Sequence, residues 1–501
     1  MNNVPFALAV SALLLLPISG CNATRADKVE PSSAQAAVIT TPAVSPAKTI
    51  RLEADKAVLT GNTLLQATTG FSGAGYAGDF IPEGAKIVWT IPDAGAGLYD
   101  VRVRYSAPFG EKGYEIVVNG KKSSGMLPAT GKTFATIPAG KAELVAGTNT
   151  VAIERGWGYF QIDSVELTPA KAAPAPTKPP AKLSDPKATA PTRALFATLI
   201  RAYGEKTLSG QQDWDDTEYL RSTVARTPAI QGADLIDYSP SRAARGSNPD
   251  KTSERLIASA KADQIVTLSW HWNAPTDLID KEYTDKNGKK INGIWWRGFY
   301  TDATTFDLEQ ALKDPNSPKY KLLVSDIDVI AAELKKFQAA GVPVLWRPLH
   351  EAEGGWFWWG AKGPEPLKKL WRILHDRLTV KHGLHNLIWV YSSGTDPKWY
   401  PGDDVVDIVG IDQYPTDVGD PLATVWETLH TQYGGRKMIA LTEFGGVPDI
   451  EKMRRYGVRW GYFASWSGGQ GPKKHSKEEL SRLYNAPGIM TLKDLPALRK
   501  K

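Results

Sequence analysis

The alternation of apolar and polar positions divides the chain into two blocks. Between residues 50 and 168, short runs rich in β-branched and aromatic residues are separated by Gly, Pro and Asn. A hairpin signal follows one of them at Val118-Asn119-Gly120-Lys121. Several short strands at this spacing predict an all-β jelly-roll sandwich. The expected strands are 86–91, 99–105, 114–118, 141–145 and 150–154.

In the second block, residues 192–501, strand-like runs alternate with amphipathic helix patterns, such as those at 326–340, 367–382 and 421–433. This alternation implies an α/β fold with a parallel sheet, and eight repeats predict a (β/α)8 TIM barrel. Residues 273–321 are too long for an ordinary loop. We expect them on the carboxyl-terminal face, where barrel active sites lie. The expected strands are 207–212, 228–237, 265–271, 343–351, 387–393, 407–413, 438–444 and 457–466.

Two Pro- and Ala-rich stretches separate the blocks from their surroundings. Residues 21–49 read as a flexible tether, and residues 169–191 as a Pro-rich linker. The apolar run 6–16 is too short to span a membrane.

The apolar run is followed by Ile18-Ser19-Gly20-Cys21. Together the run and this motif resemble a bacterial lipoprotein signal, although the first residues of the chain lack the Lys or Arg that is usual there. The resemblance implies removal of residues 1–20, lipidation of Cys21, and anchoring at the outer membrane or cell surface. A plain secretory signal or an apolar N-terminus is the alternative.

Composition narrows the function classes. The hydrophobic fraction is 42%, which is typical of globular domains, and a net charge of +6 without a basic run argues against nucleic acid. A single cysteine excludes an intrachain disulfide. The 17 tryptophans cluster beside polar residues, which favours a carbohydrate surface, because sugar rings stack on indole.

Two expected strands of the barrel carry a glutamate at their carboxyl end. Glu351 is the last residue of the run 343–351, with Arg347 on the same face at the period of a strand, and Glu443 is the next-to-last residue of 438–444. A barrel would aim both acids into one cleft. Glycoside cleavage with retention needs two carboxyls about 5–5.5 Å apart, one attacking the anomeric carbon and the other protonating the leaving oxygen. The alternative for each residue is an ordinary ion-pair acid.

Four motifs resemble glycoside hydrolase family 26. They are Arg347-Pro348-Leu349-His350-Glu351 followed by Gly355-Trp356-Phe357-Trp358-Trp359, Thr442-Glu443-Phe444-Gly445-Gly446, Gly410-Ile411-Asp412-Gln413-Tyr414 and Trp270-His271-Trp272. The resemblance implies Glu351 as acid/base and Glu443 as nucleophile. It implies sugar contacts from His271 and His350, orientation of Glu443 by Tyr414, and stacking on Trp356 and Trp466. The alternatives are a satisfied core histidine for His271, a capping hydroxyl at a strand end for Tyr414 and a barrel-core aromatic for Trp466.

Charge adds an expectation about the two acids. Glu443 must be ionised while Glu351 is protonated, and two close carboxyls raise one pKa. We expect the raised pKa on Glu351, beside Trp356 and Phe357, with Tyr414 and Arg347 keeping Glu443 charged.

The first block resembles carbohydrate-binding module family 35, from Arg51-Leu52-Glu53-Ala54-Asp55 at its start to residues 157–167 at its end. The resemblance implies a structural calcium held by Glu53, Asp55 and Asp163, whose oxygen atoms suit a hard cation. A solvated acidic pair is the alternative. Trp157 and Tyr159 are the candidate sugar-binding aromatics of this module.

Together these features predict a monomeric, exported, retaining endo-β-1,4-mannanase that needs no cofactor for catalysis. Its partner would be β-mannan or a manno-oligosaccharide, chosen because most family 26 enzymes resemble mannanases. A β-1,3-xylanase or a mixed-linkage β-glucanase on the same scaffold is the alternative within the class. An inactive cell-surface glycan-binding protein is the alternative from another class.

Overall fold

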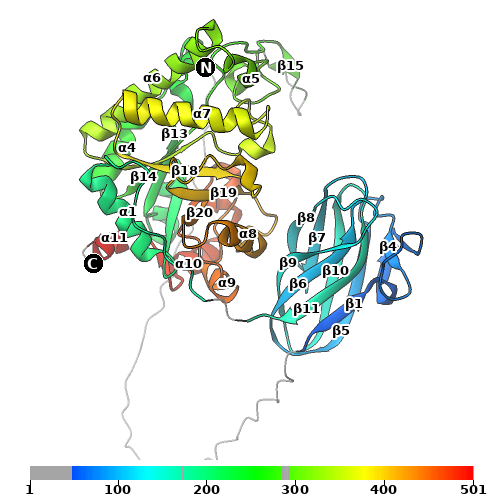
Figure 1. The fold of residues 1–501 in the computed structure, drawn as a ribbon. Helices are drawn as coiled ribbons and strands as arrows, with labels where there is room; N and C mark the ends of the chain where they lie inside the picture. The colour runs from blue at the N-terminus through cyan, green and yellow to red at the C-terminus, as the bar shows by residue number, and fades with distance from the viewer. Residues whose placement is uncertain (1–47, 172–173, 285–287, 289, 292, 500–501) are drawn as a thin grey trace, which may run out of the picture. The chain divides into compact units, whose positions relative to one another are not determined.

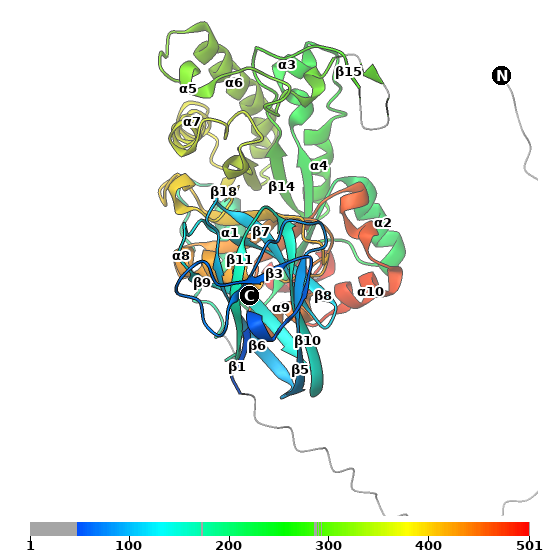
Figure 2. The same ribbon diagram turned by 90° about the vertical axis from the view of Figure 1, so that its right-hand side faces the viewer.

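A computed structural model describes residues 48–171, 174–284, 288, 290, 291 and 293–499 (Figures 1 and 2). Cys21 and the expected signal and tether lie outside the described residues, apart from the last two positions of the tether. Among the described helices, none is long and apolar enough to cross a membrane.

The N-terminal module is a sandwich of two antiparallel sheets. One has the order β3-β4-β11-β6-β9 with β1 on β11, and the other β2-β5-β10-β7-β8. Alternating residues of β5, such as Ile87 and Trp89, are buried between the sheets. The strands are β1 Ile50–Glu53, β2 Val58–Thr60, β3 Thr63–Leu65, β4 Tyr76–Gly78, β5 Lys86–Ala94, β6 Gly97–Ser106, β7 Lys112–Val118, β8 Lys121–Leu127, β9 Ala135–Leu144, β10 Gly147–Trp157 and β11 Gln161–Pro169.

The predicted hairpin is confirmed between β7 and β8. Asn119 and Gly120 have φ of 50° and 79°, the left-handed conformation that a tight two-residue turn requires. The sandwich architecture is therefore as the sequence predicts.

The second block is a closed parallel barrel. Its strands follow the order β13-β14-β17-β18-β19-β20-β21-β12, and β12 pairs with β13 to close the ring. The eight strands are β12 Thr207–Gln212, β13 Ile230–Asp234, β14 Ile265–Trp270, β17 Val344–Pro348, β18 Leu387–Ser393, β19 Ile408–Gln413, β20 Met438–Phe444 and β21 Tyr462–Ser465. A short strand, β22 Ile489–Met490, adds to β12.

Helices surround the barrel, with α4, α6 and α7 on its outside in both views (Figures 1 and 2). They are α1 Ala190–Ala202, α2 Trp214–Val224, α3 Pro240–Ala243, α4 Thr252–Lys261, α5 Leu308–Ala311, α6 Pro318–Ala339, α7 Pro364–Asp376, α8 Ala423–Tyr433, α9 Ile450–Arg455, α10 Lys477–Asn485 and α11 Leu495–Arg499. The long segment after β14 carries the hairpin β15 Tyr283–Thr284 and β16 Lys290–Ile291.

Two of the differences from the sequence-based prediction affect the site and the start of the barrel domain. The strand expected over 343–351 ends at Pro348, because Leu349 and Glu351 adopt left-handed φ of 52° and 53°. The predicted sharing of a strand face by Arg347 and Glu351 is therefore wrong.

The segment expected as a linker also contributes to the barrel. Leu183 and Ala188 are buried in its core, and the Ser184 N–H donates to Asp407 at 2.6 Å. The packing of the barrel therefore starts before residue 192.

Candidate active site

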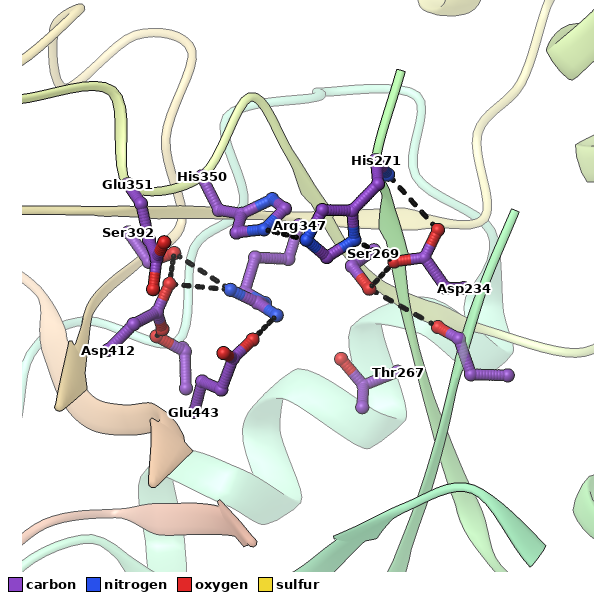
Figure 3. A network of polar contacts seen from close by, with 12 residues as sticks. Asp234, Thr267, Ser269, His271, Arg347, His350, Glu351, Ser392, Asp412 and Glu443 are labelled. Carbon is purple, nitrogen blue, oxygen red and sulfur yellow. Dashed lines mark hydrogen bonds and ion pairs between the residues drawn. The ribbon is translucent and has the colours of Figure 1, made fainter. Parts of the chain in front are cut away.

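Three buried side chains meet where β17, β19 and β20 end. Arg347 donates to Asp412 Oδ2 and to Glu443 Oε2, both at 2.6 Å. All three residues are less than 10% exposed. Figure 3 shows the guanidinium between the two carboxylates, with Glu351 on the side of Asp412. Burial raises the pKa of Asp412 to about 6, although the charge of Arg347 acts to lower it.

Glu443 is held at both carboxylate oxygens. The Tyr414 hydroxyl donates to Oε1 and Arg347 donates to Oε2. Two donors, one on each oxygen, fix the orientation of the carboxylate. This arrangement suits a nucleophile, and it matches the role expected for Tyr414.

Glu351 lies in a turn directly after β17. Its left-handed backbone is uncommon for a residue with a side chain, and such conformations concentrate at functional sites. The Trp356 indole N–H donates to Glu351 Oε2 at 3.0 Å. Burial, followed by the negative charges of Asp412 and Glu443, raises the pKa of Glu351 to about 8. Glu351 is therefore protonated at neutral pH, as a general acid must be.

The two expected sugar-binding histidines form a pair. Nε2 of His271 lies 3.1 Å from Nε2 of His350, and Nδ1 of His271 lies 2.6 Å from Asp234 Oδ2. His350 is fully buried, whereas His271 keeps part of its side chain exposed. In this arrangement His271 is the one that reaches the surface of the site.

Aromatic side chains extend the site beyond the carboxyls. Trp356 and Tyr414 are 47% and 42% exposed, which leaves their rings available for a sugar. The Trp466 ring is partly exposed and lies 6.2 Å from the His271 ring. The structure thus gathers all seven predicted residues of the barrel around one site.

Comparisons with known proteins agree with this geometry. Residues 184–494 match the sequence model of Glycosyl hydrolase family 26, and residues 50–170 match that of Carbohydrate binding module (family 35). The chain belongs to glycosyl hydrolase family 26. The match covers the whole barrel from the buried segment before α1.

Relatives of this family 26 chain share both blocks. A Mannan endo-1,4-beta-mannosidase of Thermothelomyces thermophilus is 41% identical over 96% of either chain. Mannan endo-1,4-beta-mannosidase A of Piromyces sp is 31% identical over 90% of this chain and 73% of its own. The crystal structure of the Podospora anserina GH26-CBM35 beta-(1,4)-mannanase is 43% identical, with a TM-score of 0.64, and covers 90% of this chain and 99% of its own.

Two residues of the family 26 site were given no role by the sequence analysis. Asp412 accepts from Arg347, from Ser392 and from Thr442, and Asp234 contacts His271. Each aspartate lies at or next to the carboxyl end of its strand. The strand-end rule that pointed to Glu443 would also have pointed to Asp412, but the strand expected over 228–237 ends at Asp237, so Asp234 is placed at a strand end only by the structure.

The pKa of Glu351 makes a prediction for the family 26 reaction. With Glu351 as the expected proton donor, kcat/KM should fall as pH rises through its pKa, with an alkaline half-point near 8. An unperturbed glutamate would place this point near about 4.3. Initial rates between pH 4 and 10 measure it. An alkaline limb below pH 6 would contradict protonation of Glu351 in the free enzyme.

The candidate aromatics of the module lie near the end of β10. Trp157 is 50% exposed, and Lys112 Nζ lies 5.7 Å from its ring centre. Tyr159 packs at 5.7 Å from Phe109, which is 74% exposed. Sugar binding by Trp157 and Tyr159 remains a prediction. Phe109 is a third exposed aromatic residue, in contact with Tyr159.

The predicted calcium ligands come together around Ser72. Its hydroxyl oxygen lies 2.6 Å from Glu53 Oε2 and 2.8 Å from Asp163 Oδ2, and Oδ1 of Asp55 is buried without a partner. However, Arg104 also binds Asp163. Within the described ranges no three His, Cys, Asp or Glu side chains are arranged to hold a metal. Calcium binding by Glu53, Asp55 and Asp163 therefore stays a prediction, and it would require Arg104 to release Asp163.

A chelator tests this prediction. A structural calcium predicts a lower unfolding temperature of the module in EGTA, restored by excess calcium, because a ligand of the folded state stabilises it. Differential scanning calorimetry of the full chain measures the shift. An identical transition with and without EGTA would leave Arg104 as the group that neutralises these acids.

Proposed function

We propose that this chain is a retaining endo-β-1,4-mannanase. The observation that carries the proposal is the unequal state of its two carboxyls. Glu443 is held by Arg347 and Tyr414 in a form suited to attack, while Glu351 has its pKa raised to about 8. Both relatives described above are named as mannan endo-1,4-beta-mannosidases, which favours mannan as the substrate.

In the first step, Glu443 attacks the anomeric carbon of the mannosyl unit and Glu351 gives its proton to the glycosidic oxygen. The bond to the leaving sugar breaks, and a glycosyl ester forms on Glu443. Arg347 and Tyr414 hold the attacking carboxylate in place. The Trp356 N–H keeps Glu351 oriented while the proton leaves.

In the second step, the now ionised Glu351 takes a proton from water, and this water attacks the same carbon. Glu443 is released, and the two inversions retain the β configuration. Trp356 and Trp466 offer aromatic surfaces on which neighbouring sugar rings can stack. The module would raise the local concentration of the barrel on a polymer.

Product analysis on four polymers in parallel tests the function. Mannan and galactomannan should yield short manno-oligosaccharides with a rapid loss of viscosity, while β-1,3-xylan and lichenan stay intact. Cleavage of either of the latter instead would favour the alternative β-glycanases. Binding without cleavage of any polymer would favour an inactive glycan-binding protein.

We also propose that the protein is exported and anchored by lipid at Cys21. The support is the apolar run followed by Ile18-Ser19-Gly20-Cys21. The full chain should fractionate with membranes, and Cys21→Ser should not carry lipid. Mass spectrometry of the N-terminal peptide measures this. An unmodified cysteine in the membrane-associated protein would contradict the anchor.

A further inference from the structure

Asp234, His271 and His350 form a row of polar side chains next to the catalytic pair, and none of the three takes part in the steps above. Asp234 ends β13, His271 follows β14, and His350 follows β17. Asp234 accepts the His271 backbone N–H at 3.0 Å and lies 2.6 Å from its Nδ1. The row continues from His271 to His350, away from Asp234 (Figure 3).

Proton positions in this row are restricted by its geometry. Asp234 accepts from Nδ1 of His271, so that nitrogen carries a proton. A single proton fits between the two Nε2 atoms, because two would repel and none would leave two lone pairs facing each other. Either His271 is an imidazolium that donates to His350, or His350 donates to a neutral His271.

Surrounding charges favour the imidazolium. Burial lowers the pKa of His271, but the charge and hydrogen bond of Asp234, with the charge of Glu443, outweigh it, and the pKa is raised. Arg347 acts in the opposite direction. The pKa of His350 is lowered well below its usual value by burial, by Arg347 and by His271.

Asp234 is itself held as an anion. Ser269 donates to its Oδ2 at 2.7 Å, and its pKa is lowered to about 2: burial raises this pKa, but the His271 charge and hydrogen bonds outweigh that effect. The other ring neighbours of His271 are apolar or aromatic, with Phe299 at 5.0 Å and Phe357 at 5.5 Å between ring centres. Asp234 is thus the group that directly pairs with the proton on His271 Nδ1.

We propose that Asp234 is a positioning residue that holds His271 as an imidazolium and thereby fixes His350 as the neutral Nδ1–H tautomer. His350 is fully buried and directly precedes Glu351. Its carbonyl accepts from the Trp359 indole at 2.9 Å. Among the described residues the buried Nδ1 of the ring has no hydrogen-bond partner, so the contact of Nε2 with His271 is what orients the ring between the left-handed Leu349 and Glu351. This role rests on the proposed function of the site.

Nuclear magnetic resonance of the full chain tests the protonation directly. The chain has seven histidines, so a spectrum with ¹⁵N-labelled histidine is sparse, and His271→Gln assigns the key signals. At pH 7 we expect both ring nitrogens of His271 to carry protons, and Nε2 of His350 to carry none. A neutral His271 ring at pH 7 would overturn the proposal. This readout needs no substrate, so it is independent of whether mannan is cleaved.

Asp234→Asn tests the positioning. The variant should lose the imidazolium signature at pH 7, and kcat/KM on mannan should fall about 10- to 100-fold, as expected for a misplaced catalytic group. Asp234→Glu, which keeps the charge, should restore the imidazolium and part of the rate.

The matched control is Asp185→Asn, because Asp185 Oδ2 lies 2.7 Å from His385 Nδ1 in a pair outside the site. This control should keep the wild-type kcat/KM and pH profile. If Asp234→Asn did the same, the positioning role would be wrong. If Asp234→Asn does not fold, the protonation of His271 in the wild-type spectrum still decides the proposal.

Discussion

Replacing Glu443 by Ala is expected to reduce kcat on mannan by about 10⁴-fold or more, because the group that forms the covalent bond is lost. The protein should still fold, although Arg347 then keeps only Asp412 as an ionic partner at this position. Reducing-sugar release measures the loss. Added azide should restore turnover of an activated aryl mannoside by attacking from the vacated side, giving an α-mannosyl azide.

The control for this variant is Glu365→Ala on α7, which removes an exposed glutamate paired with Lys368. Its activity should equal that of the wild type. A Glu443→Ala enzyme with more than about a tenth of the wild-type kcat could not have lost its nucleophile. A β-mannosyl azide would show that Glu443 serves as the acid/base instead.

Glu351→Gln should affect the cleavage of mannan and the cleavage of an activated aryl mannoside differently. Cleavage of mannan should fall about 10²- to 10⁴-fold, because its leaving sugar needs a proton. An aryl mannoside with an acidic phenol leaves without that proton, so the first step should persist while the second slows. The covalent intermediate then accumulates, and both kcat and KM should drop.

Stopped-flow release of the phenol measures this as a burst followed by a slow steady state. The alkaline limb of the wild-type pH profile should also disappear in Glu351→Gln. Equal losses on mannan and on the activated substrate, with no burst, would contradict the acid/base role. The matched Glu365→Ala variant should show neither change.

Much of the architecture could be predicted from the sequence. Three of the eight barrel strands, β12, β18 and β20, have the expected bounds. For β18 and β20 an apolar run marks the strand, as is typical of strands buried on both faces, whereas β12 is mostly polar. Glu443 lies at the end of one of them, so its place in the site followed from strand and barrel geometry.

The sequence identifies Glu351 as a catalytic candidate but does not predict its backbone conformation in the turn after β17. No sequence pattern predicts the left-handed backbone of Leu349 and Glu351, because this conformation depends on contacts made elsewhere in the fold. The Glu351 N–H donates to the Ser392 carbonyl at 3.0 Å, and the Trp359 indole binds the preceding carbonyl. Ser392 is distant from Glu351 in the sequence, and Trp359 lies on a loop whose sequence has no periodic pattern.

The supporting aspartates illustrate the same limit. Asp412 and Asp234 acquire their roles from Arg347 and His271, which come from other strands. A motif records residue types along one segment, whereas these pairs form only when neighbouring strands bring their ends together. The strand-end position indicates such residues, and only the folded barrel identifies their partners.

The stereochemistry of cleavage tests the central claim, that Glu443 attacks and Glu351 supplies the proton. Mannopentaose is digested in D₂O with excess enzyme, and the anomeric proton of the new reducing end is followed by NMR before mutarotation. The account predicts that the β-anomer appears first and the α-anomer grows in later. Initial release of the α-anomer would mean single inversion, and would contradict a covalent intermediate on Glu443.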